Sequence, residues 1–280
     1  SASVERELSV AAAPPSSSAE EELCFAAISF GGGDMCTLRL PADARGAHVR
    51  EALAQATGMR PEQLAPFSFI VLSTPPSAGW HHRRPHVLWH DIWEERASLR
   101  ELQVGRGGAA VVLRLSRLRL PTGRPGLFHA HEHEHPMVTM IDFYEARERF
   151  VRGDFPLRAM DDVLDLAAGL LRLSHGAYDA AVHTPFVVRL LLRELMPPKR
   201  LWPEPRMGRR HVVALLLERH RRQTAIQQVA SPHQLRVQWL ELLHTILSRL
   251  SASGLLTSSR VFAAVRVEAP HMPPRPEVTK

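Results

Sequence analysis

Apolar and polar positions alternate in the first part of the chain and recur every three to four residues in the second part. Residues 23–40 predict two strands joined at Gly31–Asp34, because Cys36, Leu38 and Leu40 alternate with Thr37 and Arg39. A helix is predicted over 46–57, with Val49 and Leu53 on one face and Gly58 at its end. Three further strands are predicted at 67–73, 87–93 and 109–121. This order of elements is that of a β-grasp lobe over residues 22–121.

Helical periodicity dominates from Met140 onward. The first predicted helix carries an apolar stripe that includes Phe143 and Phe150, and Gly153 stops it. The second helix, 161–175, is apolar on almost every side and so belongs in the middle of a bundle, with Gly176 as a left-handed C-cap. Later helices are predicted after His183, over 209–222 and from Pro232 to about Leu250.

The last of these helices has the clearest start signal. Ser231 is a predicted N-cap, Pro232 occupies the first helical position, and Gln234 completes a capping box. A buried stripe follows on this helix: Leu235, Trp239, Leu242, Ile246 and Leu250. The fold class expected is therefore α+β, a β-grasp (ubiquitin-like) lobe followed by an all-α helical bundle lobe over 138–255.

This organisation resembles a FERM domain, whose ubiquitin-like first lobe runs through a proline into a helical, acyl-CoA-binding-protein-like second lobe. The resemblance rests on the order of elements around Pro121, on a Leu/Ala-rich helix over 163–173, and on a Gly-x-Tyr-Asp turn at Gly176–Asp179. Ala177 departs from the acidic residue usual in that turn. Residues 258–267 are similar to the first strand of a third, PTB-like lobe, but only thirteen residues follow Val267. A fragment with two lobes, or a protein whose third lobe lies elsewhere, is expected.

The remaining segments are expected to connect or flank these lobes. Residues 1–21 are rich in Ala, Ser, Pro and Glu and are predicted to be disordered. Residues 122–137 form a His/Pro/Gly linker, and 256–280 hold the strand similar to the third lobe and a Pro-rich tail. There is no signal-peptide pattern and no uncharged apolar run of about 18 residues.

The two cysteines are predicted to be unpaired. A turn at Gly31–Asp34 places Cys36 opposite Ser29 and Cys24 far along the same ladder, which is poor geometry for a disulfide. A reducing, cytoplasmic location is therefore expected. The resemblance to FERM domains further implies a position at the membrane–cytoskeleton interface.

The formal charge of +6 comes from 35 Lys and Arg residues against 29 Asp and Glu, which favours an acidic partner such as a phosphoinositide surface or an acidic peptide. Two basic clusters stand out in the helical half. The first is Lys199, Arg200, Arg206, Arg209, Arg210 and His211; the second is Arg219, His220, Arg221 and Arg222. Each has two interpretations, docking to an anionic partner or ordinary solvation, with dipole complementation at a helix end for the second cluster.

Histidines also form two groups. His129, His131, His133 and His135 alternate with other residues and would project to one side of an extended chain, a geometry suited to Zn²⁺ or Ni²⁺. A solvated hinge is the competing interpretation, because a linker does not fix the groups that orient metal ligands. The run from His81 to His86 is expected to be a loop that becomes positive below neutral pH.

Catalytic signatures are absent from the sequence. It has no nucleophile elbow, P-loop, dinucleotide fingerprint or kinase motif set, and no nucleic-acid-binding module. The resemblance implies a non-enzymatic module, without a cofactor, that docks a membrane or an acidic protein to the cytoskeleton or to a motor or signalling protein. Two alternatives remain open: a regulatory fragment of a larger kinase or phosphatase, and a metal-binding linker protein.

Overall fold

The computed structural model describes residues 23–31, 34–72, 89–92, 96–104, 111–116, 135–226 and 230–252. The expected segments at 1–21, His81–His86, 122–134 and 256–280 lie outside these ranges. The first part of the chain contains β1 (Leu23–Gly31), β2 (Asp34–Pro41), α1 (Gly46–Thr57), α2 (Pro61–Leu64), β3 (Ser68–Leu72), β4 (Trp89–Ile92), α3 (Leu99–Val104) and β5 (Val111–Ser116). The second part contains α4 (Pro136–Arg152), α5 (Met160–His175), α6 (Pro185–Leu195), the 3₁₀ helix η1 (Lys199–Leu201), α7 (Arg209–Ile226) and α8 (Pro232–Ala252).

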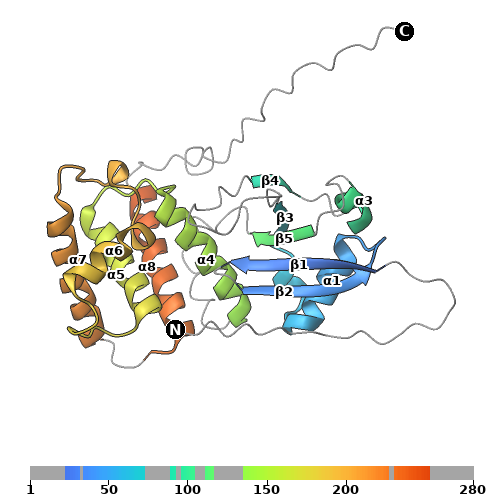
Figure 1. Cartoon of the computed structure of the whole chain (residues 1–280), viewed down its shortest axis with the longest axis horizontal. Coiled ribbons are helices and arrows are strands. Elements are labelled where there is room, and N and C mark those ends of the chain that lie inside the picture. Colours follow the sequence, from blue (N-terminus) through green and yellow to red (C-terminus); the bar gives the residue numbers. More distant parts are fainter. Residues whose placement is uncertain are drawn as a thin grey trace, which may run out of the picture.

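The five strands form one sheet in the order β2-β1-β5-β3-β4. β1 pairs antiparallel with β2 and parallel with β5, which is the pairing that the expected β-grasp requires. Residues at alternate positions of the strands pack under α1, where Val49 and Leu53 are fully buried. The predicted α+β fold class is confirmed (Figure 1). The short helices α2 and α3 were not predicted.

A register shift in the first hairpin corrects the predicted pairing of Cys36. The ladder is irregular between Ser29 and Gly31, so Cys36 lies opposite Ile28 and not opposite Ser29. An extra residue in one strand of a pair moves every later partner by one position. Both cysteines are buried and neither forms a disulfide, and burial raises the pKa of the Cys36 thiol.

The helical part packs around a second apolar core drawn from α4, α5, α6, α7 and α8. Gly153 ends α4 at φ 83° and ψ 28°, the left-handed conformation that glycine favours. Gly176 ends α5 with φ 82° but ψ −163°, so the predicted left-handed C-cap there is wrong, although the positive φ still favours glycine. The capping box of α8 is confirmed, because the Gln234 N–H donates to Ser231 Oγ at 3.2 Å and the Ser231 N–H donates to Gln234 Oε1 at 2.9 Å.

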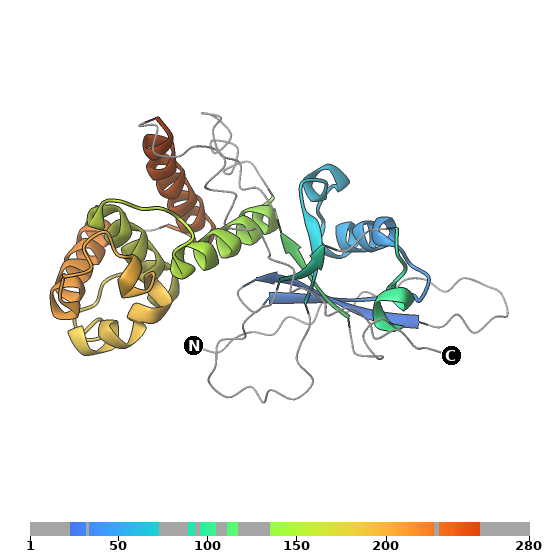
Figure 2. The same cartoon turned by 90° about the horizontal axis from the view of Figure 1, so that it is seen from above.

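Helix α4 belongs to both cores and joins the sheet to the bundle (Figures 1 and 2). It begins at Pro136, earlier than the predicted stripe from Met140, because the His135 side chain accepts a hydrogen bond from the Met137 N–H at 3.3 Å and caps the helix. Near its start Val138 and Ile141 pack into the core of the sheet lobe, whereas farther along Phe143, Ala146 and Phe150 pack into the helical core.

Polar contacts reinforce this junction between α4 and β5. Ser116 Oγ donates to Glu145 at 3.0 Å, and Arg114 forms an ion pair with Glu148 at 2.6 Å. Arg114, Ser116 and Glu145 are buried, so these contacts are shielded from water. The helix that opens the bundle is thereby tied to the sheet.

Candidate docking surface

The first basic cluster lies on η1, in the turn that follows it and at the start of α7. We call residues 199–210 the basic segment. Trp202 anchors its first turn: its ring is 5% exposed and its Nε1–H donates to the Pro197 carbonyl at 2.8 Å. Leu201 also packs closely over Gly153, where an added Cβ would clash with the Leu201 side chain. These contacts fix the backbone that carries Lys199 and Arg200.

Helix α7 is held in place by Val212, Val213 and Leu216, which are at most 3% exposed. Its N-terminal end carries Arg209 and Arg210, and no acidic residue occupies the first turn. All five Lys and Arg residues of the basic segment are exposed: Lys199, Arg200, Arg206, Arg209 and Arg210. Among the described residues they make no ion pair. The positive end of a helix disfavours cations, so the two arginines of α7 lack the dipole complementation that would explain them as structural.

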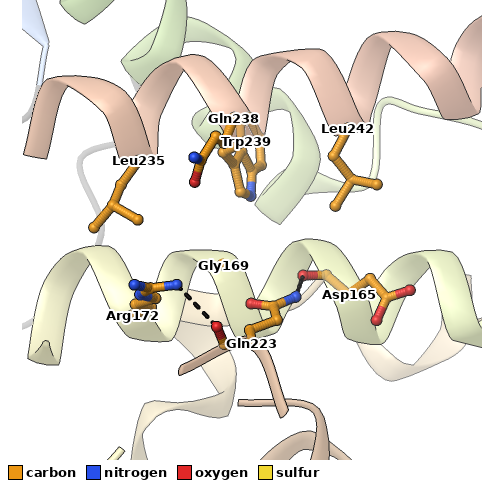
Figure 3. A pocket seen from close by; sticks show the side chains of 8 residues that line it. All are labelled: Asp165, Gly169, Arg172, Gln223, Leu235, Gln238, Trp239 and Leu242. Atoms are coloured by element: carbon orange, nitrogen blue, oxygen red, sulfur yellow. Dashed lines mark hydrogen bonds between the residues drawn. The ribbon is translucent and has the colours of Figure 1, made fainter. Parts of the chain in front are cut away.

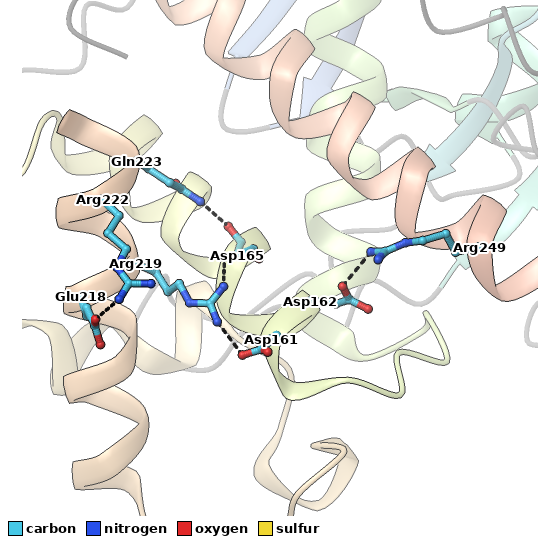
Figure 4. Close-up of polar contacts among 8 residues, drawn as sticks. All are labelled: Asp161, Asp162, Asp165, Glu218, Arg219, Arg222, Gln223 and Arg249. Atoms are coloured by element: carbon cyan, nitrogen blue, oxygen red, sulfur yellow. Dashed lines mark hydrogen bonds and ion pairs between the residues drawn. The ribbon is translucent and has the colours of Figure 1, made fainter. Parts of the chain in front are cut away.

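The second basic cluster has a different environment (Figure 4). Arg219 donates to Asp165 at 2.8 Å and to Asp161 at 2.6 Å, and thereby ties α7 to α5. Arg222 pairs with Glu218 one turn earlier on the same helix. Arg221 is exposed and makes no ion pair among the described residues. Because α7 continues to Ile226, the predicted dipole complementation at residues 219–222 is wrong: no basic residue lies in the last turn.

Replacing Arg219 with alanine is expected to destabilise the helical lobe by about 1 kcal/mol, because both of its carboxylate partners are partly exposed. Burial raises the pKa of Asp165, and removal of the cation that opposes this effect would raise it further. Urea unfolding at neutral pH measures the loss. Arg221→Ala, on the same helix, serves as the control and is expected to change stability by less than about 0.5 kcal/mol. Equal effects of the two substitutions would contradict a structural role specific to Arg219.

A cavity of about 230 Å³ opens between α5, α7 and α8 (Figure 3). Leu235, Trp239 and Leu242 line it from α8, and Arg172 lines it from α5. The Arg172 guanidinium donates to the Gln223 carbonyl at 3.1 Å, which links α5 to the last turns of α7. The polar groups at this cavity therefore serve to join helices.

His220, which the sequence placed in the second cluster, is not a surface cation. Its side chain is 0% exposed and packs edge-on against His183, with ring centroids 4.7 Å apart. Tyr178 stacks on His183 and completes a ring cluster between α7 and the turn after α5. Burial, with the neighbouring His183 and Arg172, lowers the pKa of His220 to about 4, so the ring is neutral at pH 7.

Of the four alternating histidines, His135 belongs to the described structure, and its side chain caps α4. His129, His131 and His133 lie outside the described residues. Within the described ranges, no group of three or more His, Cys, Asp or Glu side chains is arranged to hold a metal ion. None of the helices in those ranges has the length and apolar character needed to cross a bilayer.

Comparison with known proteins identifies solved structures with a similar architecture. No protein-family model matches the sequence, and no curated protein matches it either. Among solved structures, the FERM and C-terminal domain complex of Drosophila Merlin is similar, with a TM-score of 0.52 and 14% identity over 79% of this chain and 65% of that chain. The MyTH4-FERM MF2 domain of Dictyostelium discoideum Myosin VII is similar with a TM-score of 0.56 and 10% identity over 81% of this chain and 41% of that chain. The chain therefore has a FERM-like fold and spans less than two thirds of these structures.

Proposed function

We propose that this chain is a non-catalytic docking module of FERM type, which binds an acidic partner through the basic segment and couples it to the cytoskeleton or to a motor or signalling protein. The partner is an anionic membrane surface or an acidic stretch of protein. The observation that carries the proposal is the set of five exposed Lys and Arg residues in 199–210, without ion pairs among the described residues.

The electrostatics of α7 support this role for the basic segment. Arg209 and Arg210 stand at the positive end of the helix dipole, where each cation costs up to about 1 kcal/mol. An anion bound between these side chains and the free backbone N–H groups of the first turn would offset that cost. Arg219 differs from these arginines, because two carboxylates of α5 pair with it. Arg219 therefore has a structural role, whereas the cations of the basic segment are available to a partner.

The similar structures support a docking role at the level of the fold. One of them contains the FERM domain of Merlin in complex with a C-terminal domain, so in that protein the fold engages a protein partner. The similar Myosin VII structure contains a FERM unit beside a MyTH4 unit. Both are consistent with a module that links one component to another.

The test is charge reversal in the basic segment. The triple variant Arg206→Glu, Arg209→Glu and Arg210→Glu is expected to bind vesicles containing phosphatidylserine and phosphoinositide at least about tenfold more weakly at low salt, because each basic residue near an anionic surface contributes about 1 kcal/mol. Vesicle cosedimentation measures the change. Glutamate at positions 209 and 210 suits the helix N-terminus, so misfolding is not the expected cause of lost binding.

A matched control reverses the same number of charges elsewhere. Arg39, Arg45 and Arg60 are exposed in the β-grasp lobe, and their replacement by glutamate changes the net charge by the same amount. Both triple variants are also compared at moderate salt, where long-range attraction is screened, and vesicle binding by the control is expected to stay within about threefold of wild type there. If both triple variants weaken binding equally, the basic segment is not the contact surface.

A further inference from the structure

Helix α6 is apolar on two opposite faces. Val188, Leu192 and Leu195 point into the helical core and are at most 7% exposed. Phe186 and Leu190, by contrast, are 71% and 63% exposed. A helix rotates by about 100° per residue, so both residues lie roughly opposite the buried Val188. A helix on the surface of a soluble domain normally has a polar outer face. The outer face of α6 therefore has the character of a contact surface.

A third exposed apolar residue lies in the turn before the helix. Val182 is 51% exposed and lies four residues before Phe186. Thr184 caps the helix by accepting a hydrogen bond from the Val187 N–H at 3.3 Å, and Pro185 occupies the first helical position. This cap holds the turn and the first residues of α6 in one fixed arrangement, so the stripe is preformed.

Positive charge accompanies the stripe. Arg189 and Arg193 are exposed and follow Phe186 and Leu190 by three residues each, which places them beside the apolar residues on the helix. Over residues 182–210 there are seven Lys and Arg against two Glu. The segment thus combines exposed apolar side chains with a strong excess of cations.

We propose that the outer face of α6, formed by Val182, Phe186 and Leu190, enters the interfacial region of an anionic bilayer, with Arg189 and Arg193 contacting lipid phosphates. This inference rests on the proposed docking function and names its partner as a membrane surface. Apolar side chains of an interfacial helix are buried at the boundary between headgroups and acyl chains, while flanking basic side chains reach the headgroups.

A bilayer fits this face better than an acidic protein does. On the helix itself the stripe runs from Phe186 to Leu190, about one turn or roughly 6 Å, and lies on the outer side of the helix. A stable protein interface buries about 800 Å² on each partner, far more than three side chains supply. The cavity of the helical lobe is lined from α5, α7 and α8 and not from α6, so it does not extend the stripe into a groove. A few apolar side chains combined with basic ones are sufficient for binding at a membrane interface.

The experiment compares two double variants of the full chain in cosedimentation with vesicles of phosphatidylcholine and phosphatidylserine. Phe186→Ser with Leu190→Ser is expected to lower the partition coefficient about tenfold, since both side chains lose their burial in the interface. The loss is expected to persist as salt rises, because apolar contacts are not screened. Phe25→Ser with Met35→Ser removes two comparably exposed side chains from the β-grasp lobe and is expected to leave partitioning unchanged.

The outcomes separate this inference from the docking function. If the α6 variant partitions like the wild type at every salt concentration while reversal of Arg206, Arg209 and Arg210 abolishes binding, the α6 inference is overturned and the docking function stands. If neither set of changes affects partitioning, the α6 inference and the proposed docking function are both contradicted. Thermal unfolding checks that the α6 variant keeps its fold, as expected for residues that are more than half exposed.

Discussion

Replacing Trp239 with alanine is expected to destabilise the helical lobe by about 3–5 kcal/mol. The Trp239 side chain is 2% exposed and its Nε1–H donates to the Leu166 carbonyl at 2.9 Å. Its ring packs edge-on against Phe143 and Phe150, with centroid separations of 5.3 and 6.1 Å. Truncation removes these contacts and leaves a cavity among α4, α5 and α8. Urea unfolding followed by circular dichroism measures the loss.

Gly169 of α5 lies directly against the Trp239 ring. A Cβ at Gly169 would lie 2.7 Å from Trp239 Cδ1, so glycine is needed for the close approach of α8 to α5. Trp239→Phe, which keeps an aromatic ring, is expected to lose less than half as much stability as Trp239→Ala. Gln238→Ala, exposed on the same helix, provides the surface control. A loss below about 1 kcal/mol for Trp239→Ala would show that the two helices repack without the indole ring.

Elements with strong local signals were predictable from the sequence. The capping box at Ser231 marked the start of α8 correctly. Its predicted buried stripe is only partly correct: Trp239 and Ile246 are buried, but Leu235, Leu242 and Leu250 are only partly buried. The helix buries Val237, Leu240, Leu243 and Leu247 instead. Gly58, with φ 71° and ψ 11°, ends α1 as its position after the last apolar residue indicated. Such signals depend on residues within one or two turns of each other, and therefore survive without knowledge of the tertiary structure.

Features that depend on distant residues were not predictable in this way. The irregularity between Ser29 and Gly31 that moves Cys36 opposite Ile28 arises from strand pairing and leaves no mark on the hydrophobic pattern. The sheet core takes Val138 and Ile141 from α4, although both follow the predicted linker. In the sequence, a helix that packs into two cores shows one continuous apolar stripe, so the stripe does not indicate which residue packs into which core.

The same limit applies to the candidate site. The sequence grouped Arg219 with Arg221 as equivalent cations, but the carboxylates that pair with Arg219 lie 54 and 58 residues earlier in the chain. Within α6, the run from Val187 to Leu192 gave no indication of which apolar residues face the core. The structure distinguishes buried Val188 from exposed Leu190, and this distinction identifies the outer face.

Acidification is expected to destabilise the helical lobe through His220. Neither ring nitrogen of His220 has a hydrogen-bond partner among the described residues, and His183 Nε2 is likewise buried and unpartnered there. The ring faces His183 and Tyr178, and the nearby Arg172 and His175 of α5 also disfavour a charge on it. The pKa of His220 is therefore about 4 in the folded protein, against about 6.5 for an unperturbed histidine.

The sign of the pH effect follows from these two pKa values. Between pH 6.5 and 4 the unfolded chain binds a proton at this position and the folded protein does not, so stability present above pH 6.5 is lost as the pH falls toward 4. The loss attributable to this one ring is about 3 kcal/mol. Urea unfolding at intervals from pH 7 to pH 4 measures it.

The comparison variants are His220→Leu, which keeps a buried apolar side chain without a titratable group, and His175→Leu, which removes an exposed imidazole at the end of α5. His220→Leu is expected to flatten the dependence of unfolding free energy on pH by about 3 kcal/mol across this interval, whatever its stability at pH 7. His175→Leu is expected to retain nearly the full slope. Parallel slopes for the wild type and His220→Leu would mean that His220 becomes protonated in the folded protein at an ordinary pH, and that α7 accommodates its charge against His183.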